Sequence, residues 1–349
     1  MTLPRLRTGA APALAAVLPL AACSAASTGT AGGDDGLSVL ASFYPLQYVA
    51  EQVGGDHVSV ESVTPPGVDP HDLELAPADV ARLDAAGLVV YLSGFQAAMD
   101  EAVDATSPAR VLDVAPVAAE TAEEHAEHAG GSASAEAGHE DEAGHEDEAG
   151  HEDEAGHETD AGHEAEEHGD DHAGHSHADG DPHFWLDPTR LAEVADAVAD
   201  ELSDVDPDNA EDYAANAAAL VAELTALDAD YADTLETCET RTIVVGHEAY
   251  GYLGERYDLE QVGISGLDPE SEPSPARLAE IGDVVEAEGV TTIFAESLVN
   301  RQVSESLAAD LGVEVAVLDP LGAQLDPAAD YQDVMRTNLQ ALADALACS

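Results

Sequence analysis

Short strand-like runs alternate with helical stretches along this chain, and this alternation limits the possible folds more than any other feature. Before a low-complexity segment in the middle, runs rich in Val and Leu are separated by stretches with helical spacing. The expected strands are 37–41, 58–63, 88–92 and 110–114, and the expected helices are 45–53, 77–86 and 96–105. A strand–helix–strand order of this kind predicts a largely parallel sheet flanked by helices.

A second series of the same kind occupies the C-terminal part. The expected strands are 242–245, 259–264, 292–295 and 313–318, and the expected helices are 276–288, 302–311 and 331–347. Between the two series, residues 189–202 and 207–236 have helical spacing. An unbroken helix over 207–236 would be about 45 Å long. We therefore predict an α/β protein of two lobes, 37–206 and 238–349, joined by one rigid helix over 207–237.

Residues 120–180 form a segment rich in His, Asp and Glu that repeats the unit Gly-His-Glu-Asp-Glu-Ala. The repeats contain no apolar residue larger than alanine, so we expect a disordered loop. Eleven of the fifteen histidines lie between 125 and 177, and imidazole binds transition metals. The candidate accessory metal ligands are His139, His145, His151, His157, His163, His168, His172, His175 and His177. They should lose metal below about pH 6, when imidazole protonates. Delivery and storage of zinc both remain open as the role of this loop.

The N-terminus is typical of an export signal. Arg5 and Arg7 precede an apolar run that ends at residue 22, which is too short to span a bilayer. The sequence Leu-Ala-Ala-Cys over 20–23 resembles the bacterial lipoprotein signal. This resemblance implies that 1–22 is removed, that Cys23 is lipidated, and that 23–36 is a tether to the outer face of the cell membrane. Ordinary secretion with loss of Cys23 is the alternative.

The two remaining cysteines, Cys238 and Cys348, suggest a disulfide, because an exported chain is exposed to an oxidising environment. The alternative is a pair of free thiols that bind metal, although neither cysteine has a CxxC-type neighbour. The formal charge of −63 argues against nucleic acid as a partner, since nucleic acid requires basic patches. All ten basic residues are arginine, and we interpret this composition as surface adaptation in a high-GC or salt-tolerant bacterium.

Four histidines lie outside the repeated segment. His57 stands at a turn before an expected strand, where we predict a surface residue. His71, His183 and His247 lie at the carboxyl ends of expected strands or in adjacent loops, where α/β sheets build their sites, and Asp319 also follows a strand. Three imidazoles and one carboxylate would make a tetrahedral site that suits zinc. A hydrogen-bonded loop residue is the alternative for each histidine.

Several motifs resemble one known family, the zinc-binding substrate-binding lipoproteins of bacterial ABC importers, a group that also contains manganese-binding members. The resemblance covers about 39–347. The segments that carry it are Pro-His-Asp-Leu-Glu-Leu-Ala-Pro-Ala-Asp at 70–79, His-Phe-Trp-Leu-Asp-Pro at 183–188, Gly-His-Glu-Ala-Tyr-Gly-Tyr at 246–252, Gly-Ile-Ser-Gly-Leu at 263–267 and Glu-Pro-Ser-Pro at 272–275. It implies two α/β lobes linked by one rigid helix, with metal in the cleft between them.

The resemblance also implies a ligand set of His71, His183, His247 and Asp319 for Zn²⁺. Water or another carboxylate fills the fourth position in some zinc members, and Glu248 is a minor candidate here. Manganese members carry glutamate at the third position, so His247 favours zinc.

The resemblance implies that the chain is a monomer that captures zinc, hands it to an ABC permease with its ATPase, and contacts the membrane only through its lipid anchor. Alternatives are a binding protein for manganese or another divalent metal, a surface adhesin or metal buffer, and a zinc enzyme. No HExxH motif, nucleophile elbow or general base supports an enzyme.

Overall fold

The computed structural model describes residues 36–119, 180–299 and 301–349. The predicted signal peptide, the lipidated Cys23, nearly all of the tether and the histidine-rich repeats lie outside these described residues, so what the sequence indicates about them stays a prediction. Within the described residues, no helix is both long and apolar enough to cross a membrane.

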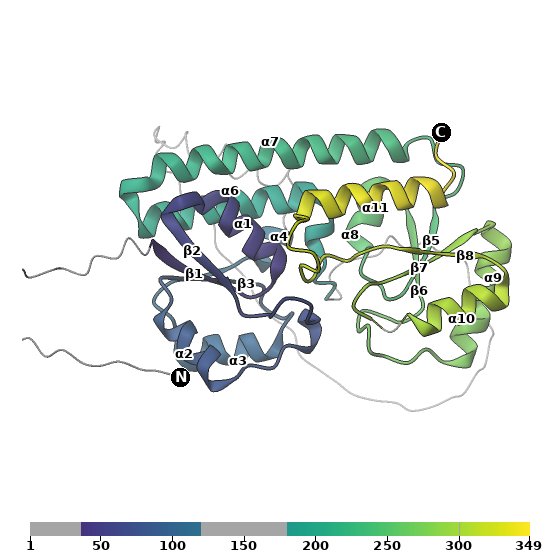
Figure 1. Ribbon diagram of the computed structural model, residues 1–349, viewed down its shortest axis with the longest axis horizontal. Coiled ribbons are helices and arrows are strands. Elements are labelled where there is room, and N and C mark those ends of the chain that lie inside the picture. Colours follow the sequence, from purple (N-terminus) through teal and green to yellow (C-terminus); the bar gives the residue numbers. More distant parts are fainter. Residues whose placement is uncertain (1–35, 120–179, 300) are drawn as a thin grey trace, which may run out of the picture. The chain divides into compact units, whose positions relative to one another are not determined.

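The first sheet contains four parallel strands in the order β2-β1-β3-β4 (Figure 1). The strands are β1 (Leu37–Ala41), β2 (Val58–Ser62), β3 (Leu88–Tyr91) and β4 (Val111–Asp113). The helices of this part are α1 (Tyr44–Gly54), α2 (Pro77–Ala85), α3 (Ala97–Thr106) and α4 (Ala115–Ala119). Leu40 and Val89 pack with buried side chains of α2 and α3, whereas Val39 and Val90 belong to the core that contains α1. The alternation of side chains along each strand thus gives the sheet two buried faces.

The second sheet repeats this topology, with the order β6-β5-β7-β8 and all pairs parallel. Its strands are β5 (Thr242–Val245), β6 (Glu260–Gly263), β7 (Thr292–Ala295) and β8 (Glu314–Val317). Its helices are α8 (Gly251–Tyr257), α9 (Pro275–Glu288), α10 (Gln302–Leu311) and α11 (Tyr331–Ala345). Val244 and Ile293 face α9 and α10, while Ile243 and Phe294 face the core that contains α8 and α11.

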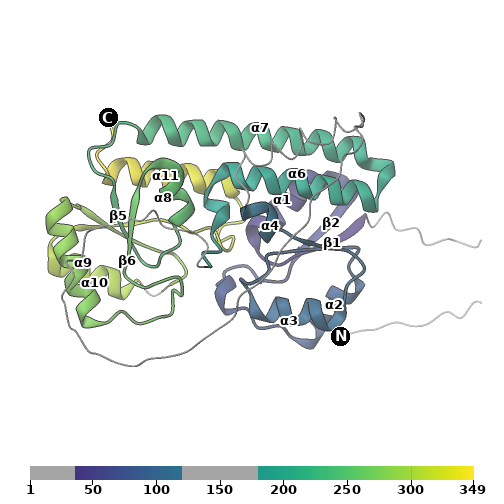
Figure 2. The same cartoon turned by 180° about the vertical axis from the view of Figure 1, so that it is seen from behind.

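A pair of long helices connects the two halves of the chain, and Figures 1 and 2 show α6 and α7 side by side. They are α6 (Pro188–Val205) and α7 (Ala210–Leu235), separated by a 3-10 turn at Pro207–Asn209. The α7 helix contacts α1 on one side of the chain and both α8 and α11 on the other. Its buried stripe recurs every three or four residues, at Tyr213, Ala217, Leu220, Leu224, Leu227, Tyr231 and Leu235. The predicted fold of two parallel sheets with a long helix between them is confirmed.

The differences from the sequence prediction are small and local. The long helix begins at Ala210, because the three residues before it form the separate 3-10 turn. The short helices α4 and α8 have no counterpart among the predicted helices. Glycine at the first and fourth positions of α8 hides its helical character from propensity.

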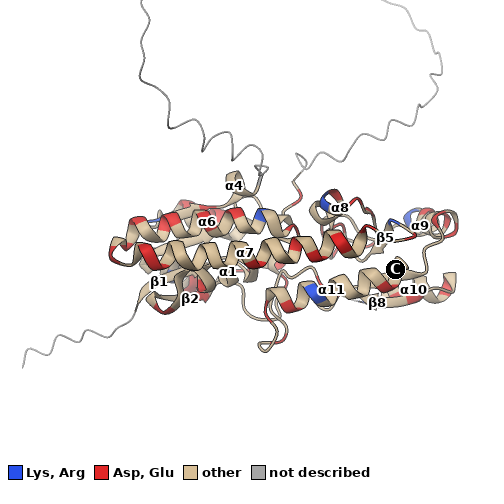
Figure 3. Cartoon of the chain, turned by 90° about the horizontal axis from the view of Figure 1, so that it is seen from above, with Lys and Arg blue, Asp and Glu red and all other residues tan. Residues whose placement is uncertain are grey.

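The predicted disulfide between Cys238 and Cys348 is present, which removes the alternative that these thiols bind metal. It joins the segment after α7 to the C-terminal residues after α11. Acidic residues recur along α6, α7 and α11, where basic residues are few (Figure 3). The described surface is therefore one that attracts cations rather than polyanions.

Candidate metal site

His71 is held in place by the turn that carries it. It lies in a 3-10 turn, Pro70–Asp72, in the loop that follows β2. The Asp69 side chain caps this turn, since its Oδ1 accepts from the His71 backbone N–H at 2.9 Å. The buried Gln96 donates from Nε2 to the Pro70 carbonyl at 3.1 Å. The ring of His71 packs edge-on against Phe95, with centroids 4.9 Å apart. Its backbone and one face of its ring are thus fixed before any ligand arrives.

His183 is oriented by a carboxylate two residues before it. Asp181 Oδ1 accepts from the His183 backbone N–H at 2.9 Å and lies 2.8 Å from the ring Nδ1. The side chain of His183 is only 1% exposed, and its ring packs against Trp185 with centroids 5.1 Å apart. Because Asp181 can accept a hydrogen bond from Nδ1–H, we assign the neutral ring a protonated Nδ1 and an unprotonated Nε2.

His247 is oriented in the same way, by a residue from a neighbouring strand. It lies just after β5, and Glu296 lies directly after β7. Glu296 Oε1 accepts from the His247 backbone N–H at 3.0 Å and lies 2.7 Å from Nδ1. Gly246 permits this approach, because a Cβ there would lie 2.6 Å from the same oxygen. His247 therefore also presents an unprotonated Nε2 to the interior.

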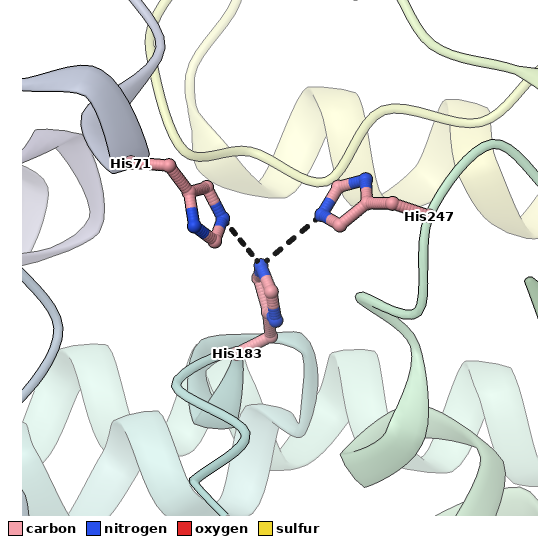
Figure 4. Close-up of side chains that lie close together, drawn as sticks. All are labelled: His71, His183 and His247. Atoms are coloured by element: carbon pink, nitrogen blue, oxygen red, sulfur yellow. Dashed lines mark hydrogen bonds between the residues drawn. The ribbon is translucent and has the colours of Figure 1, made fainter. Parts of the chain in front are cut away.

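The three imidazoles converge on one point (Figure 4). His71 Nε2 lies 3.1 Å from His183 Nε2, and His247 Nε2 lies 3.3 Å from the same atom. Among the described residues, these three form the one group of potential ligands whose binding atoms all lie within 4.8 Å of one another. Zn–N bonds of about 2.0–2.1 Å in a tetrahedral site place two nitrogens about 3.3–3.4 Å apart. The spacing of the histidines therefore matches zinc coordination.

The protonation state of the cluster also suits a metal. Burial, followed by the neighbouring His183 and His247, lowers the pKa of His71 to about 3. Burial likewise lowers the pKa of His183. Both rings are neutral at pH 7, so their lone pairs are available without loss of a proton. The Nε2 atoms of His183 and His247 lie 3.3 Å apart while a carboxylate lies against each Nδ1, an arrangement that a cation beside the two Nε2 atoms would stabilise.

The cavity at the cluster is small, about 20 Å³, which is room for about one ion or water. Its wall includes the three histidines, Asp69, Pro70, Trp185, Glu296, Leu298, Asp319, Pro320 and Gly322. Asp319 is thus brought to the site, as predicted, but its oxygens do not join the close group of nitrogens. Its Oδ1 accepts from the Leu321 N–H at 2.8 Å, and burial raises its pKa. A fourth ligand at Asp319 stays a prediction.

Two other predicted residues lie away from this cavity. His57 pairs with Asp212 at 2.9 Å, and its side chain is one-third exposed. Glu248, the minor ligand candidate, lies 3.7 Å from Arg277 and does not line the cavity. Sequence reasoning missed the two orienting carboxylates, Asp181 and Glu296. The one available signal was position, since Asp181 stands two residues before a candidate ligand and Glu296 directly after an expected strand.

Replacing Glu296 with Ala is expected to weaken zinc binding about 10- to 100-fold, because a free His247 ring loses its orientation and its protonated Nδ1. Glu296→Gln should lose less, since its amide oxygen still accepts hydrogen bonds. Calorimetry on each purified variant measures the effect. Equal affinities for Glu296→Ala and the unchanged chain would show that Glu296 does not orient His247. Glu286→Ala, on the exposed part of α9, is the matched control.

Comparison with known proteins gives a consistent set of relatives. A family model described as zinc-uptake complex component A, periplasmic (ZnuA), matches residues 39–345. The chain is 32% identical over 341 residues to the high-affinity zinc uptake system protein ZnuA of Bacillus subtilis, covering 95% of each. It is 31% identical over 314 residues to the zinc-binding lipoprotein AdcA of Streptococcus pneumoniae, covering 88% of this chain. It spans only 56% of the length of AdcA.

Solved structures agree with this pattern. The Zn(II)-bound ZnuA-like domain of Streptococcus pneumoniae AdcA matches with a TM-score of 0.65 and 26% identity, covering 89% of this chain and 99% of that domain. The laminin-binding protein Lmb of Streptococcus agalactiae, described as bifunctional with adhesin and metal transporting activity, matches with a TM-score of 0.68 and 29% identity. That match covers 89% of this chain and 100% of Lmb.

Proposed function

We propose a function for this chain on the basis that it belongs to the periplasmic zinc-uptake complex component A family. It captures Zn²⁺ outside the cytoplasm and delivers it to an ABC permease, which an ATPase drives. The names of its relatives, a high-affinity zinc uptake protein and a zinc-binding lipoprotein, support this proposal. Zinc is here the transported cargo rather than a resident cofactor.

One observation carries the proposal: three buried or half-buried imidazoles converge, with the Nε2 atoms of His71 and His247 3.1 and 3.3 Å from that of His183. We propose His71, His183 and His247 as the ligands, with Asp319 or water in the fourth position. Nitrogen ligands favour zinc over manganese, which prefers oxygen. A preoriented site of this kind binds tightly, because little conformational entropy is lost on binding.

Release is proposed to occur by ligand exchange with small movements of loops or lobes. The α7 helix packs against helices from both halves of the chain, which opposes wide hinge motion. A hydrogen bond joins the loop of Asp319 to the segment that carries His183, since Trp185 Nε1 donates to the Pro320 carbonyl at 2.7 Å. We propose that exchange begins when this loop moves and the carboxylate of Asp319 withdraws from the metal.

We propose that the chain is a monomer without catalytic activity, held at the outer face of the membrane through lipidated Cys23. The cavity of about 20 Å³ at the histidines supports the absence of catalysis there, since it holds an ion but no organic substrate. The lipoprotein name of one relative supports the anchor. Functions of AdcA outside the matched 56% of its length are not extended to this chain.

Growth of a zinc-starved host tests transport directly. A bacterium that lacks its own copy of this chain, but keeps the permease and ATPase, is grown with a zinc chelator. The unchanged chain and His57→Ala, the surface control, should restore growth and zinc uptake, while His183→Ala should not. Restoration by His183→Ala would contradict capture by the three histidines. If the chain were an adhesin that does not transport zinc, uptake of radioactive zinc would be the same in every strain.

A further inference from the structure

A second cavity, of about 270 Å³, lies next to the histidine cluster and shares one wall with it. Glu296 lines both this cavity and the small cavity that contains the histidines. Gly246 also lines the larger cavity, and its bare Cα lies against the Glu296 carboxylate. The carboxylate of Glu296 therefore stands at the boundary between the two spaces.

The second carboxylate oxygen of Glu296, Oε2, makes no hydrogen bond to the histidine cluster. Glu296 Oε1 holds His247, but the buried Oε2 has no hydrogen-bond partner among the described residues. The Glu296 side chain is only 2% exposed. A buried carboxylate oxygen is stable only when a hydrogen-bond donor or a cation meets it. Glu296 lines the larger cavity as well as the small one, so a cation in the larger cavity can approach the carboxylate that His247 uses through Oε1 alone.

The outer rim of the larger cavity is acidic. The exposed Glu270 and Glu272 line it, and they belong to the loop between β6 and α9. Asp268 braces this loop, because its carboxylate accepts from the Glu270 N–H at 2.9 Å and from Ser271 Oγ at 3.0 Å. Arg301 is the one basic residue in the lining, and Glu305 lies 3.6 Å from its Nε. The rim thus offers carboxylates, and its single positive charge is partly neutralised.

We propose that this larger cavity, the antechamber, is a second and weaker position for a hydrated divalent cation on the route to the histidines. Glu270 and Glu272 receive the ion, and Glu296 Oε2 holds it at the inner wall. Carboxylate and water oxygens bind zinc less tightly than three imidazoles do, so the ion passes on rather than remaining. The proposal rests on the proposed function and adds a route of entry and exit to it.

The single tryptophan allows the route to be tested in the full chain. Trp185 packs against His183, so its fluorescence reports zinc at the histidine cluster. Stopped-flow mixing with Zn²⁺ alone gives the association rate, and release to a chelator gives the dissociation rate. The test variant is E270Q/E272Q. The control E286Q/E288Q removes two exposed acids from α9, in the same half of the chain, that do not line the antechamber.

If the antechamber lies on the route of zinc, E270Q/E272Q should slow association and dissociation of Zn²⁺ by the same factor, roughly tenfold. The equilibrium affinity for Zn²⁺ should stay unchanged. The control should keep both rates. Mn²⁺, which prefers oxygen ligands, should slow zinc entry into the unchanged chain and the control but not into E270Q/E272Q. Equal slowing of both double variants would assign the effect to general surface charge and overturn the proposal. Unchanged rates in E270Q/E272Q would overturn it as well.

The same traces separate this proposal from the proposed function. If the unchanged chain shows no Trp185 response and no zinc binding at equilibrium, zinc capture at the histidines itself is wrong. If equilibrium binding is tight while E270Q/E272Q has normal rates, only the route through the antechamber is wrong.

Discussion

His247→Ala is expected to lower the zinc affinity of the full chain by about 10²–10³-fold. Zinc bound by four protein ligands gains about 10–16 kcal/mol in total, so each ligand accounts for about 2.5–4 kcal/mol. Each 1.4 kcal/mol is about a tenfold change in affinity. The loss also exposes the Glu296 carboxylate to a cavity without its imidazole donor. Calorimetry with a competing chelator measures the tight site in each variant.

Deletion of residues 125–177 is the informative comparison for that variant. These repeats should bind zinc weakly at many positions, because their composition predicts no packed core that would hold several imidazoles around one ion. Their removal should reduce the number of zinc ions bound while leaving the tight site nearly unchanged. His57→Ala, which changes a surface histidine, should match the unchanged chain. If the deletion and His247→Ala lose affinity equally, the three-histidine cluster is not the principal site.

The fold was largely predictable because strands and helices differ in the spacing at which their apolar residues recur. Each strand of both sheets coincides with a predicted run to within one residue at either end. The central strands β3, β5 and β7 are buried and nearly continuous apolar runs, which makes their limits clear. The long helix was visible from the three- and four-residue spacing of its apolar side chains. Its true start at Ala210 was not, since a 3-10 turn and an α-helix share that spacing over one turn.

The site was predictable only in part, for a physical reason. His71 lies in the loop after β2 and His247 directly after β5, at edges where parallel strands end. His183 instead precedes the 3-10 turn that leads into α6, so its approach does not follow from a sheet edge. The contact of His247 with Glu296 spans 49 residues and depends on the pairing of β5 with β7. No local pattern encodes that register. The resemblance to a known family supplied the ligand set, but the orienting carboxylates required coordinates.

Removing the disulfide should cost about 5 kcal/mol of unfolding free energy, because it closes a loop of 110 residues. In the chain-entropy model this stabilisation comes from restricting the unfolded chain, and it grows slowly with loop length. Cys238→Ser, Cys348→Ser and the double variant should therefore lose the same amount. Urea unfolding under oxidising conditions measures the three losses, with the metal removed so that zinc binding does not contribute.

Equal losses are expected because the native ends stay together without the sulfur bond. Glu239 N–H donates to the Leu346 carbonyl at 3.0 Å, and Thr237 Oγ1 donates to the Ser349 carbonyl at 2.8 Å. These contacts preserve the folded structure around α7 and α11, so the effect arises in the unfolded state. Zinc affinity at pH 7 should be unchanged in all three variants, since neither cysteine lines the histidine cavity. A loss below about 1 kcal/mol, or a loss of zinc affinity, would show that the disulfide acts through the folded structure instead.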